Sequence, residues 1–220
     1  MKINNFDTDK SFMYENGFYL SSNDRRIGKM LAHYELYKRI THLPGDIVEC
    51  GVFKGNSFFR FAHFRNILEC QDSRKIIGFD IFGKFPSTNF DADKGKRQAF
   101  IDEAGAESIS IDSMHKALKY KNIRNYELVK GNILESVPKY CAENPQLKIS
   151  LLHIDTDVYE PAVCILENMY DKVVGGGVIV FDDYGTFPGE TKAVDDFFKD
   201  KNVVIQKLPL AHIPAFIIKG

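Results

Sequence analysis

The 220-residue chain has only four cysteines, and it contains no apolar run that approaches transmembrane length. The cysteines are scattered and include no C-x-x-C pair, which argues against a zinc site or a redox motif. Cys50 and Cys164 lie among apolar residues and are expected to pack as small hydrophobes. The first residues are polar and broken by charges, so no signal peptide is expected, and the default compartment is the cytoplasm.

The chain also lacks an excess of either charge, because its formal net charge is −1. Proteins that bind phosphate backbones or anionic membranes show a basic excess. We therefore expect neither a nucleic acid nor a membrane as partner. The length fits one α/β domain with a sizeable core.

Segments typical of strands and of helices alternate along the chain. Short runs rich in Ile and Val indicate strands buried on both faces, and their alternation with helices indicates a doubly wound, mostly parallel sheet. The expected strands cover 46–50, 75–80, 125–129, 149–154 and 178–181, followed by an antiparallel hairpin of 203–208 and 215–218. The expected helices cover 24–41, 57–68, 94–104, 133–143, 159–174 and 190–199. The prediction is one Rossmann-like α/β domain over 1–220, with a seven-stranded sheet.

Two segments stand outside this alternation. Residues 83–122 form an unusually long connection, and long loops are usually functional, so we expect a lid or cap there. Residues 1–41 are an N-terminal arm and helix, in which Leu36 falls off the apolar stripe of the helix. Aromatic residues in the arm predict that it is ordered, either as an active-site lid or as a contact in a homo-oligomer.

Paired carboxylates follow two of the expected strands. Asp155 and Asp157 follow 149–154, while Asp182 and Asp183 follow 178–181. Ligands in such sheets bind beyond the carboxyl ends of the strands, so the four acids converge if the two strands are neighbours. Carboxylates in one small volume repel one another unless raised pKa values or a cation relieve them, and Mg²⁺ is a cation that oxygen ligands suit. These acids indicate a metal-dependent active site, although Asp182 and Asp183 alone are also typical of a strand-end turn.

The turn after the first expected strand indicates a cofactor site. Gly51 and Gly55 allow a sharp turn and the close approach of a ligand, but the G-x-G-x-x-G of dinucleotide binders and the Gly-Lys-Ser/Thr of phosphate loops are absent. Asp80 ends the second expected strand, where an acid can bind both hydroxyls of a ribose. Glu49 makes this loop more acidic, and an acidic loop suits a cationic or neutral ligand better than a pyrophosphate. The loop therefore favours S-adenosylmethionine over NAD.

These residues resemble the macrocin O-methyltransferase (TylF-type) family of S-adenosylmethionine-dependent, Mg²⁺-dependent sugar O-methyltransferases. The resemblance extends over about 46–198. It is carried by Glu49-Cys50-Gly51-Val52, Gly78-Phe79-Asp80-Ile81-Phe82, Gly131-Asn132-Ile133, Asp155-Thr156-Asp157-Val158-Tyr159-Glu160, and Asp182-Asp183-Tyr184 followed by Lys192-Ala193-Val194-Asp195.

The resemblance implies a class I methyltransferase fold and a role for each acid. Asp155, Asp182 and Asp183 would be the metal ligands, and Asp157 the candidate catalytic base. The cofactor would be lined by Glu49, Gly51, Ser57 and Asp80, with Asn132 near the adenine. The expected partner is a small hydroxylated molecule, a sugar in a glycosylated or nucleotide-linked compound.

Transfer to a sugar hydroxyl requires that its proton be removed or its pKa lowered. Asp157 would point to the same side as Asp155 if the strand continued, and His153 shares that side as a reserve base, although a buried histidine is more often structural. Tyr184 either contacts the substrate or packs. Three other functions stay open: a catechol-type O-methyltransferase, a NAD-dependent enzyme, and a non-catalytic module that binds S-adenosylmethionine.

Overall fold

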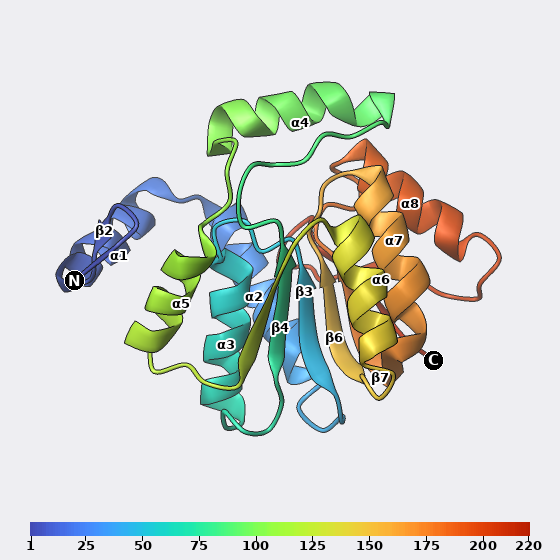
Figure 1. The fold of residues 1–220 in the computed structure, drawn as a ribbon, viewed down its shortest axis with the longest axis horizontal. Coiled ribbons are helices and arrows are strands. Elements are labelled where there is room, and N and C mark those ends of the chain that lie inside the picture. Colours follow the sequence, from blue (N-terminus) through green and yellow to red (C-terminus); the bar gives the residue numbers. More distant parts are fainter.

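The computed structural model describes residues 1–220, and a seven-stranded sheet forms its centre (Figure 1). The strands are, in order across the sheet, β5 (Tyr126–Lys130), β4 (Ile76–Asp80), β3 (Asp46–Cys50), β6 (Ile149–Ile154), β7 (Val173–Phe181), β9 (Ala215–Ile218) and β8 (Gln206–Lys207). Neighbours from β5 to β7 are parallel, whereas β9 is antiparallel to β7 and to β8. The predicted mostly parallel sheet with a closing antiparallel hairpin is confirmed.

Helices cover both faces of the sheet, so its central strands are buried and mostly apolar. One face packs against α6 (Ile133–Glu143), α7 (Tyr159–Met169) and α8 (Pro188–Phe198). The other packs against α2 (Asp24–Lys38), α3 (Asn56–Leu68) and α5 (Ile111–Tyr120). Alternate residues of each strand therefore belong to different cores; Val48 and Cys50 of β3 lie in the first and Ile47 in the second.

The long segment 83–122 divides into two parts with different positions. Its first helix, α4 (Asp91–Ala104), lies across the carboxyl ends of the strands, where the predicted lid would lie (Figure 1). Its second helix, α5, packs beside α3 and contributes Met114 and Leu118 to the core. Only the first part is therefore placed to cover a site.

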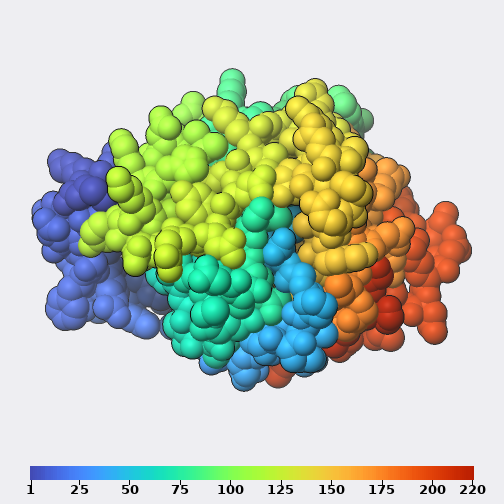
Figure 2. All heavy atoms as spheres, turned by 60° about the horizontal axis from the view of Figure 1, so that its bottom comes forward, coloured from blue at the N-terminus to red at the C-terminus, as the bar shows by residue number.

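The N-terminal arm projects from one side of the molecule (Figures 1 and 2). It consists of β1 (Lys2–Ile3), β2 (Phe6–Asp7), the 3₁₀ turn η1 (Thr8–Lys10) and α1 (Ser11–Ser21). No residue of α1 is buried, and Phe12 and Leu20 are among its exposed apolar side chains. A contact between copies of the chain stays a prediction. None of the helices combines the length and apolar character needed to cross a membrane.

The predicted apolar stripe over residues 24–41 is confirmed at its end, where Tyr37 and Ile40 are fully buried, but the buried face of α2 is broader than the stripe. Leu36 is fully buried, although the predicted stripe omitted it, and Leu31, which the stripe included, is 41% exposed. The first buried residue of α2 is Gly28. A side chain does not fit there, because a Cβ on Gly28 would lie 2.2 Å from the carbonyl oxygen of Leu210. Ala32 and His33, about one turn further along α2, are buried as well.

Arg74 joins three connections at the amino ends of the strands. Its buried guanidinium donates to Glu69, to Ser150 of β6 and to the carbonyl oxygens of Gly45 and Ile40. We expect Arg74→Met to lower the free energy of unfolding by about 3–5 kcal/mol, because it leaves the largely buried carboxylate of Glu69 without its cationic partner. Urea denaturation measures this loss.

The matched control for this prediction is Lys38→Met, which removes an exposed pair with Glu35. Exposed pairs contribute little, so the control should stay within about 0.5 kcal/mol of wild type. Equal unfolding free energies for the two variants would show that Arg74 does not hold these connections together.

Candidate active site

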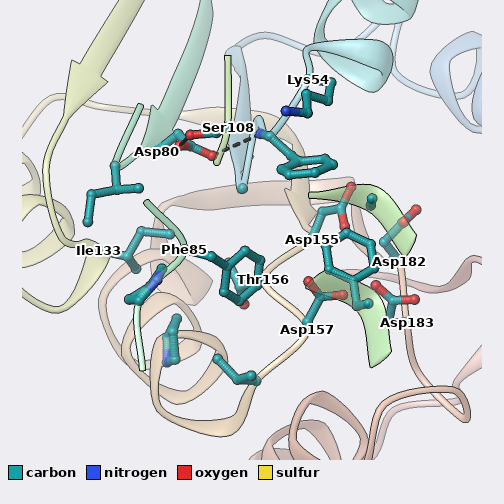
Figure 3. Close-up of a pocket in the computed structure, with 18 of the residues that line it drawn as sticks. Lys54, Asp80, Phe85, Ser108, Ile133, Asp155, Thr156, Asp157, Asp182 and Asp183 are labelled. Carbon is teal, nitrogen blue, oxygen red and sulfur yellow. Dashed lines mark hydrogen bonds between the residues drawn. The ribbon is translucent and has the colours of Figure 1, made fainter. Parts of the chain in front are cut away.

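A cavity of about 520 Å³ opens at the carboxyl ends of the strands, beneath α4 (Figure 3). Neither the N-terminal arm nor Tyr184 lines it. The Tyr184 hydroxyl instead donates to Asp195 of α8 at 2.8 Å. The predicted site residues that line the cavity are Gly51, Asp80, Asn132, Asp155, Asp157, Asp182 and Asp183.

The four acids converge because β6 and β7 are neighbours. Ile154 and Phe181 are paired in register, and the amide of Asp182 donates to the carbonyl oxygen of Ile154 at 2.9 Å. Asp155 and Asp182 therefore leave adjacent strand ends side by side (Figure 3). Their expected juxtaposition is confirmed.

Asp157 reaches the cavity by a different route from the predicted one. The strand ends at Ile154, and Asp157 adopts a left-handed backbone conformation with φ +63° in the turn before α7. Continued strand alternation was therefore the wrong reason for placing it beside Asp155. Left-handed conformations of residues other than glycine are uncommon and concentrate at functional sites.

Gly51 lets the turn after β3 touch the acidic loop. Its φ is +96°, and a Cβ at this position would lie 1.8 Å from the carbonyl oxygen of Asp155. No other residue fits such an approach without moving the backbone. The predicted cofactor turn and the predicted metal ligands therefore belong to one cavity.

Asp80 is held rigidly at the other side of the cavity (Figure 3). Its carboxylate accepts hydrogen bonds from the amides of Phe53 and Phe82, at 2.9 and 2.6 Å, and from the Ser108 hydroxyl at 2.8 Å. Ser108 comes from the segment between α4 and α5, and no sequence pattern pointed to it. Asn132 lines the same end, and its side-chain oxygen caps α6 by accepting from the amide of Leu134.

Three predicted cofactor residues do not line the cavity: Glu49, Gly55 and Ser57. The Glu49 side chain is fully buried, accepts a hydrogen bond from Ser57 and lies 3.6 Å from His153 Nδ1. Its second oxygen, Oε2, has no partner. The cofactor role of these three residues stays a prediction.

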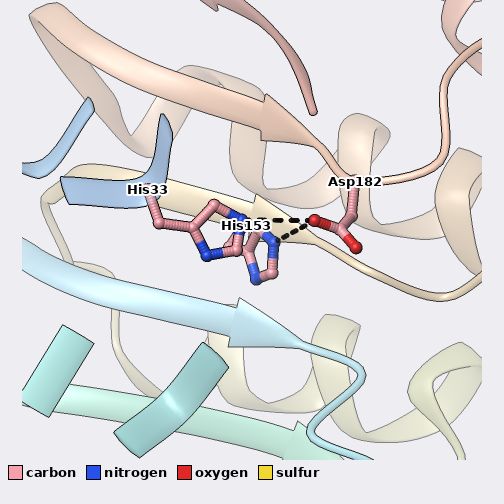
Figure 4. Close-up of side chains that lie close together, drawn as sticks. All are labelled: His33, His153 and Asp182. Atoms are coloured by element: carbon pink, nitrogen blue, oxygen red, sulfur yellow. Dashed lines mark hydrogen bonds and ion pairs between the residues drawn. The ribbon is translucent and has the colours of Figure 1, made fainter. Parts of the chain in front are cut away.

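A charged and hydrogen-bonded group surrounds Asp182 (Figure 4). His33 of α2 and His153 of β6 place their Nε2 atoms 3.4 and 3.2 Å from the same oxygen, Oδ1. Lys29 of α2 bonds to the other oxygen, Oδ2. Both imidazoles are fully buried. The nitrogens of His153 face Asp182 and Glu49, so this histidine has no exposed nitrogen that could take a proton from a substrate.

The two histidines bear different charges. Burial alone would lower the pKa of His153, but the neighbouring carboxylates of Asp182 and Glu49 raise it to about 10. Burial lowers the pKa of His33 to about 4, since only one carboxylate faces it. The first imidazole is therefore cationic at neutral pH and the second neutral, and both donate to Asp182.

The other acids of the cavity resist ionisation together. Burial, and then the charge of Asp182, raises the pKa of Asp155, and the same causes raise that of Asp183 to about 6. Burial and the neighbouring Asp183 raise the pKa of Asp157 well above its ordinary value. A cation at this point would let all of them ionise.

Asp155, Asp182 and Asp183 fit a divalent metal. Their carboxylate oxygens lie within 4.8 Å of one another. Oxygens around one octahedral Mg²⁺ lie about 3–4 Å apart, so small side-chain adjustments would complete such a set. The donors are all oxygens, which suits Mg²⁺ or Mn²⁺ better than Zn²⁺.

Asp93 fastens α4 over the cavity. This buried carboxylate accepts from the amides of Tyr159 and Gly189 at 3.0 and 2.7 Å, and so joins α4 to the amino ends of α7 and α8. Glu160 likewise accepts from the Thr88 hydroxyl and the Asn89 amide. These contacts fix a cover that the sequence had only indicated as a long connection.

Aromatic side chains line the cavity beneath α4. Phe100 of α4 lies between Phe53, Phe85 and Phe187, with ring centroids 5.3, 5.9 and 6.3 Å away. The cavity thus combines an apolar wall with a group of acids. Such a surface suits a ligand that has both apolar and hydroxyl-bearing parts.

The sheet order, the glycine turn after β3 and the acid at the end of β4 define a class I methyltransferase fold. The crystal structure of CalS11, calicheamicin methyltransferase, superposes with a TM-score of 0.74 at 28% identity, covering 97% of this chain and 87% of that one. The structure of the O-methyltransferase NovP superposes with a TM-score of 0.74 at 20% identity, covering 88% of this chain and 80% of the other, and so supports the fold.

The family model of macrocin-O-methyltransferase (TylF) matches residues 24–216, and the chain belongs to that family. Demethyldecarbamoylnovobiocin O-methyltransferase of Streptomyces niveus is 28% identical over 71% of this chain and 59% of its own length. Mycinamicin III 3''-O-methyltransferase of Micromonospora griseorubida is 24% identical over 70% and 61%, respectively. The chain thus spans less than two thirds of the length of these relatives.

Proposed function

We propose that this chain transfers a methyl group from S-adenosylmethionine to a hydroxyl of a sugar, in a reaction that requires Mg²⁺. The observation that carries this proposal is the convergence of four carboxylates beside the glycine turn and Asp80. Family membership supports the methyl donor. A sugar hydroxyl as acceptor is supported by the name of a further relative, the 8-demethyl-8-(2,3-dimethoxy-alpha-L-rhamnosyl)-tetracenomycin-C 4'-O-methyltransferase of Streptomyces olivaceus, which is 25% identical over 64% of this chain and 54% of its own length.

Different residues of the chain would bind the methyl donor and the acceptor. Asp80, preset by Phe53 and Ser108, would accept the ribose hydroxyls, and the loop at Asn132 would lie beside the adenine. Asp155, Asp182 and Asp183 would hold the metal, which would lower the pKa of the acceptor hydroxyl and orient it.

Asp157 is the carboxylate left to act as a base. It lines the cavity beside the three metal ligands and is not needed to complete their set. It would take the hydroxyl proton as the methyl carbon leaves sulfur and bonds to oxygen, giving a methyl ether and S-adenosylhomocysteine. His153 is less suited, because both of its nitrogens face buried carboxylates.

An acceptor screen with labelled S-adenosylmethionine tests this proposal. Sugar nucleotides and glycosides are compared with catechols, with Mg²⁺ present throughout. Transfer to a sugar supports the proposal, whereas transfer to catechols alone would assign the chain to the catechol type. Binding of the donor with no transfer to any class would favour a non-catalytic module.

We expect S-adenosylmethionine to bind with a micromolar dissociation constant, about −7 to −8 kcal/mol. Asp80→Ala should weaken it at least tenfold, because the variant loses the acceptor for two ribose hydroxyls. Calorimetry measures both constants. Asp72→Ala, at an exposed position outside the cavity, should bind as wild type does. Unchanged affinity in Asp80→Ala would remove Asp80 from the cofactor site.

A further inference from the structure

Lys29 places a positive charge inside the acidic group, at a position that no motif had indicated. Its ammonium bonds to Asp182, and its side chain is 26% exposed against 2% for Asp182. It lines the same cavity as Asp155 and Asp183. Lys29 is thus the side chain that neutralises part of this group when no metal is present.

The two oxygens of Asp182 are used differently (Figure 4). Oδ1 receives both buried histidines, His33 and His153, which fix the orientation of the carboxylate. Oδ2 is bonded only by Lys29, which comes from the cavity side. A metal that takes Asp182 as a ligand would therefore bind through Oδ2. In the structure this oxygen is occupied by the ammonium group of Lys29.

An ammonium and a divalent cation cannot share this oxygen at close range, because like charges a few ångströms apart repel strongly where water is scarce. Lysine is able to leave, since its charge lies at the end of a flexible four-carbon stem that retains some exposure. The histidines have no such freedom, because both are fully buried. The competition therefore concerns Lys29 and not its neighbours.

We propose that Lys29 is an internal counter-ion that competes with the metal for Asp182. It stabilises the acidic site when no metal is bound, and it swings away from Oδ2 when the metal binds. This inference rests on the metal site of the proposed function. Lys29 would lower the affinity of the site for the metal, because the metal must displace the ammonium group from Asp182.

Metal titration tests this competition without any methyl transfer. Calorimetry with Mn²⁺ compares wild type with Lys29→Met, which keeps the apolar stem and removes the charge. We expect the variant to bind Mn²⁺ at least tenfold more tightly, equivalent to about 1.4 kcal/mol. Lys54→Met is the matched control, because Lys54 lines the same cavity but donates to the carbonyl oxygen of Glu107. Its Mn²⁺ affinity should equal that of wild type.

Thermal unfolding provides a second readout. Without metal, Lys29→Met should melt below wild type, because its carboxylates lose their counter-ion, and saturating Mn²⁺ should remove most of the difference. A purely structural lysine would lower the melting temperature equally with and without Mn²⁺. Lys29→Gln replaces the methionine variant if circular dichroism shows that the latter does not fold.

Two results would overturn the inference, and they are distinguishable. If wild type binds Mn²⁺ and the folded Lys29 variant binds it equally or more weakly, Lys29 does not compete, while the metal site of the proposed function stands. If wild type binds no Mn²⁺ at millimolar concentration, the metal site and the competition both fall.

Discussion

Asp157→Asn is expected to lower kcat by about 10²–10⁴-fold, the usual contribution of a general base. Asparagine has nearly the same shape but cannot take a proton. It also tolerates the left-handed backbone conformation at position 157, where φ is +63°, so the turn should be preserved. Steady-state kinetics with labelled S-adenosylmethionine measure the loss.

Binding measurements on the same variant separate a base from a ligand. Asp157→Asn should keep the affinities of wild type for Mg²⁺ and S-adenosylmethionine, whereas Asp155→Asn should need more Mg²⁺ for half-maximal rate, because Asp155 belongs to the oxygen set. A near-normal kcat in Asp157→Asn would mean that the proton leaves by another route.

Chelation of divalent metal by EDTA is expected to abolish transfer, and added Mg²⁺ or Mn²⁺ to restore it. Burial and mutual repulsion oppose the ionisation of Asp155 and Asp183 when no metal is bound, and the acceptor hydroxyl would lose the group that acidifies it. Turnover before and after dialysis into EDTA measures the effect.

Cofactor binding is the internal control for chelation. Asp80 and Gly51 do not belong to the oxygen set, so the dissociation constant for S-adenosylmethionine should change less than about threefold, under 1 kcal/mol. Undiminished turnover in EDTA would contradict the metal requirement even if methyl transfer itself were observed.

The sequence was sufficient to predict the central sheet, because strands covered on both faces form nearly continuous apolar runs. The bounds of β3 and β6 agree with those predicted. β7 starts at Val173, earlier than expected, because its first part contains Gly175, Gly176 and Gly177, which carry no strand preference.

Side chains that depend on packing between distant segments were harder to predict. Lys29 and His33 both reach Asp182 because they lie four residues apart on α2, a spacing that the sequence displays. The pattern of large apolar residues nevertheless did not include these two polar side chains. Gly28 packs against the backbone of Leu210, a contact between remote parts of the chain that local sequence does not display.

The acids of the site were predictable, whereas their partners were not. Asp155 and Asp182 follow strand ends, and parallel pairing brings such ends together. Ser108 and Asp93 lie in the long connection, where no periodicity relates them to Asp80 or to the amino ends of α7 and α8. Hydrogen bonds of this kind follow from the fold and not from local sequence.

Crystals grown with S-adenosylhomocysteine and Mn²⁺ would test the central claim most directly, by anomalous diffraction at the manganese edge. The account predicts one manganese peak about 2.1 Å from oxygens of Asp155, Asp182 and Asp183. It also predicts Lys29 withdrawn from Asp182 and the ribose hydroxyls on Asp80. A cofactor bound elsewhere, or a site without manganese in which Lys29 still bonds to Asp182 at saturating Mn²⁺, would contradict it.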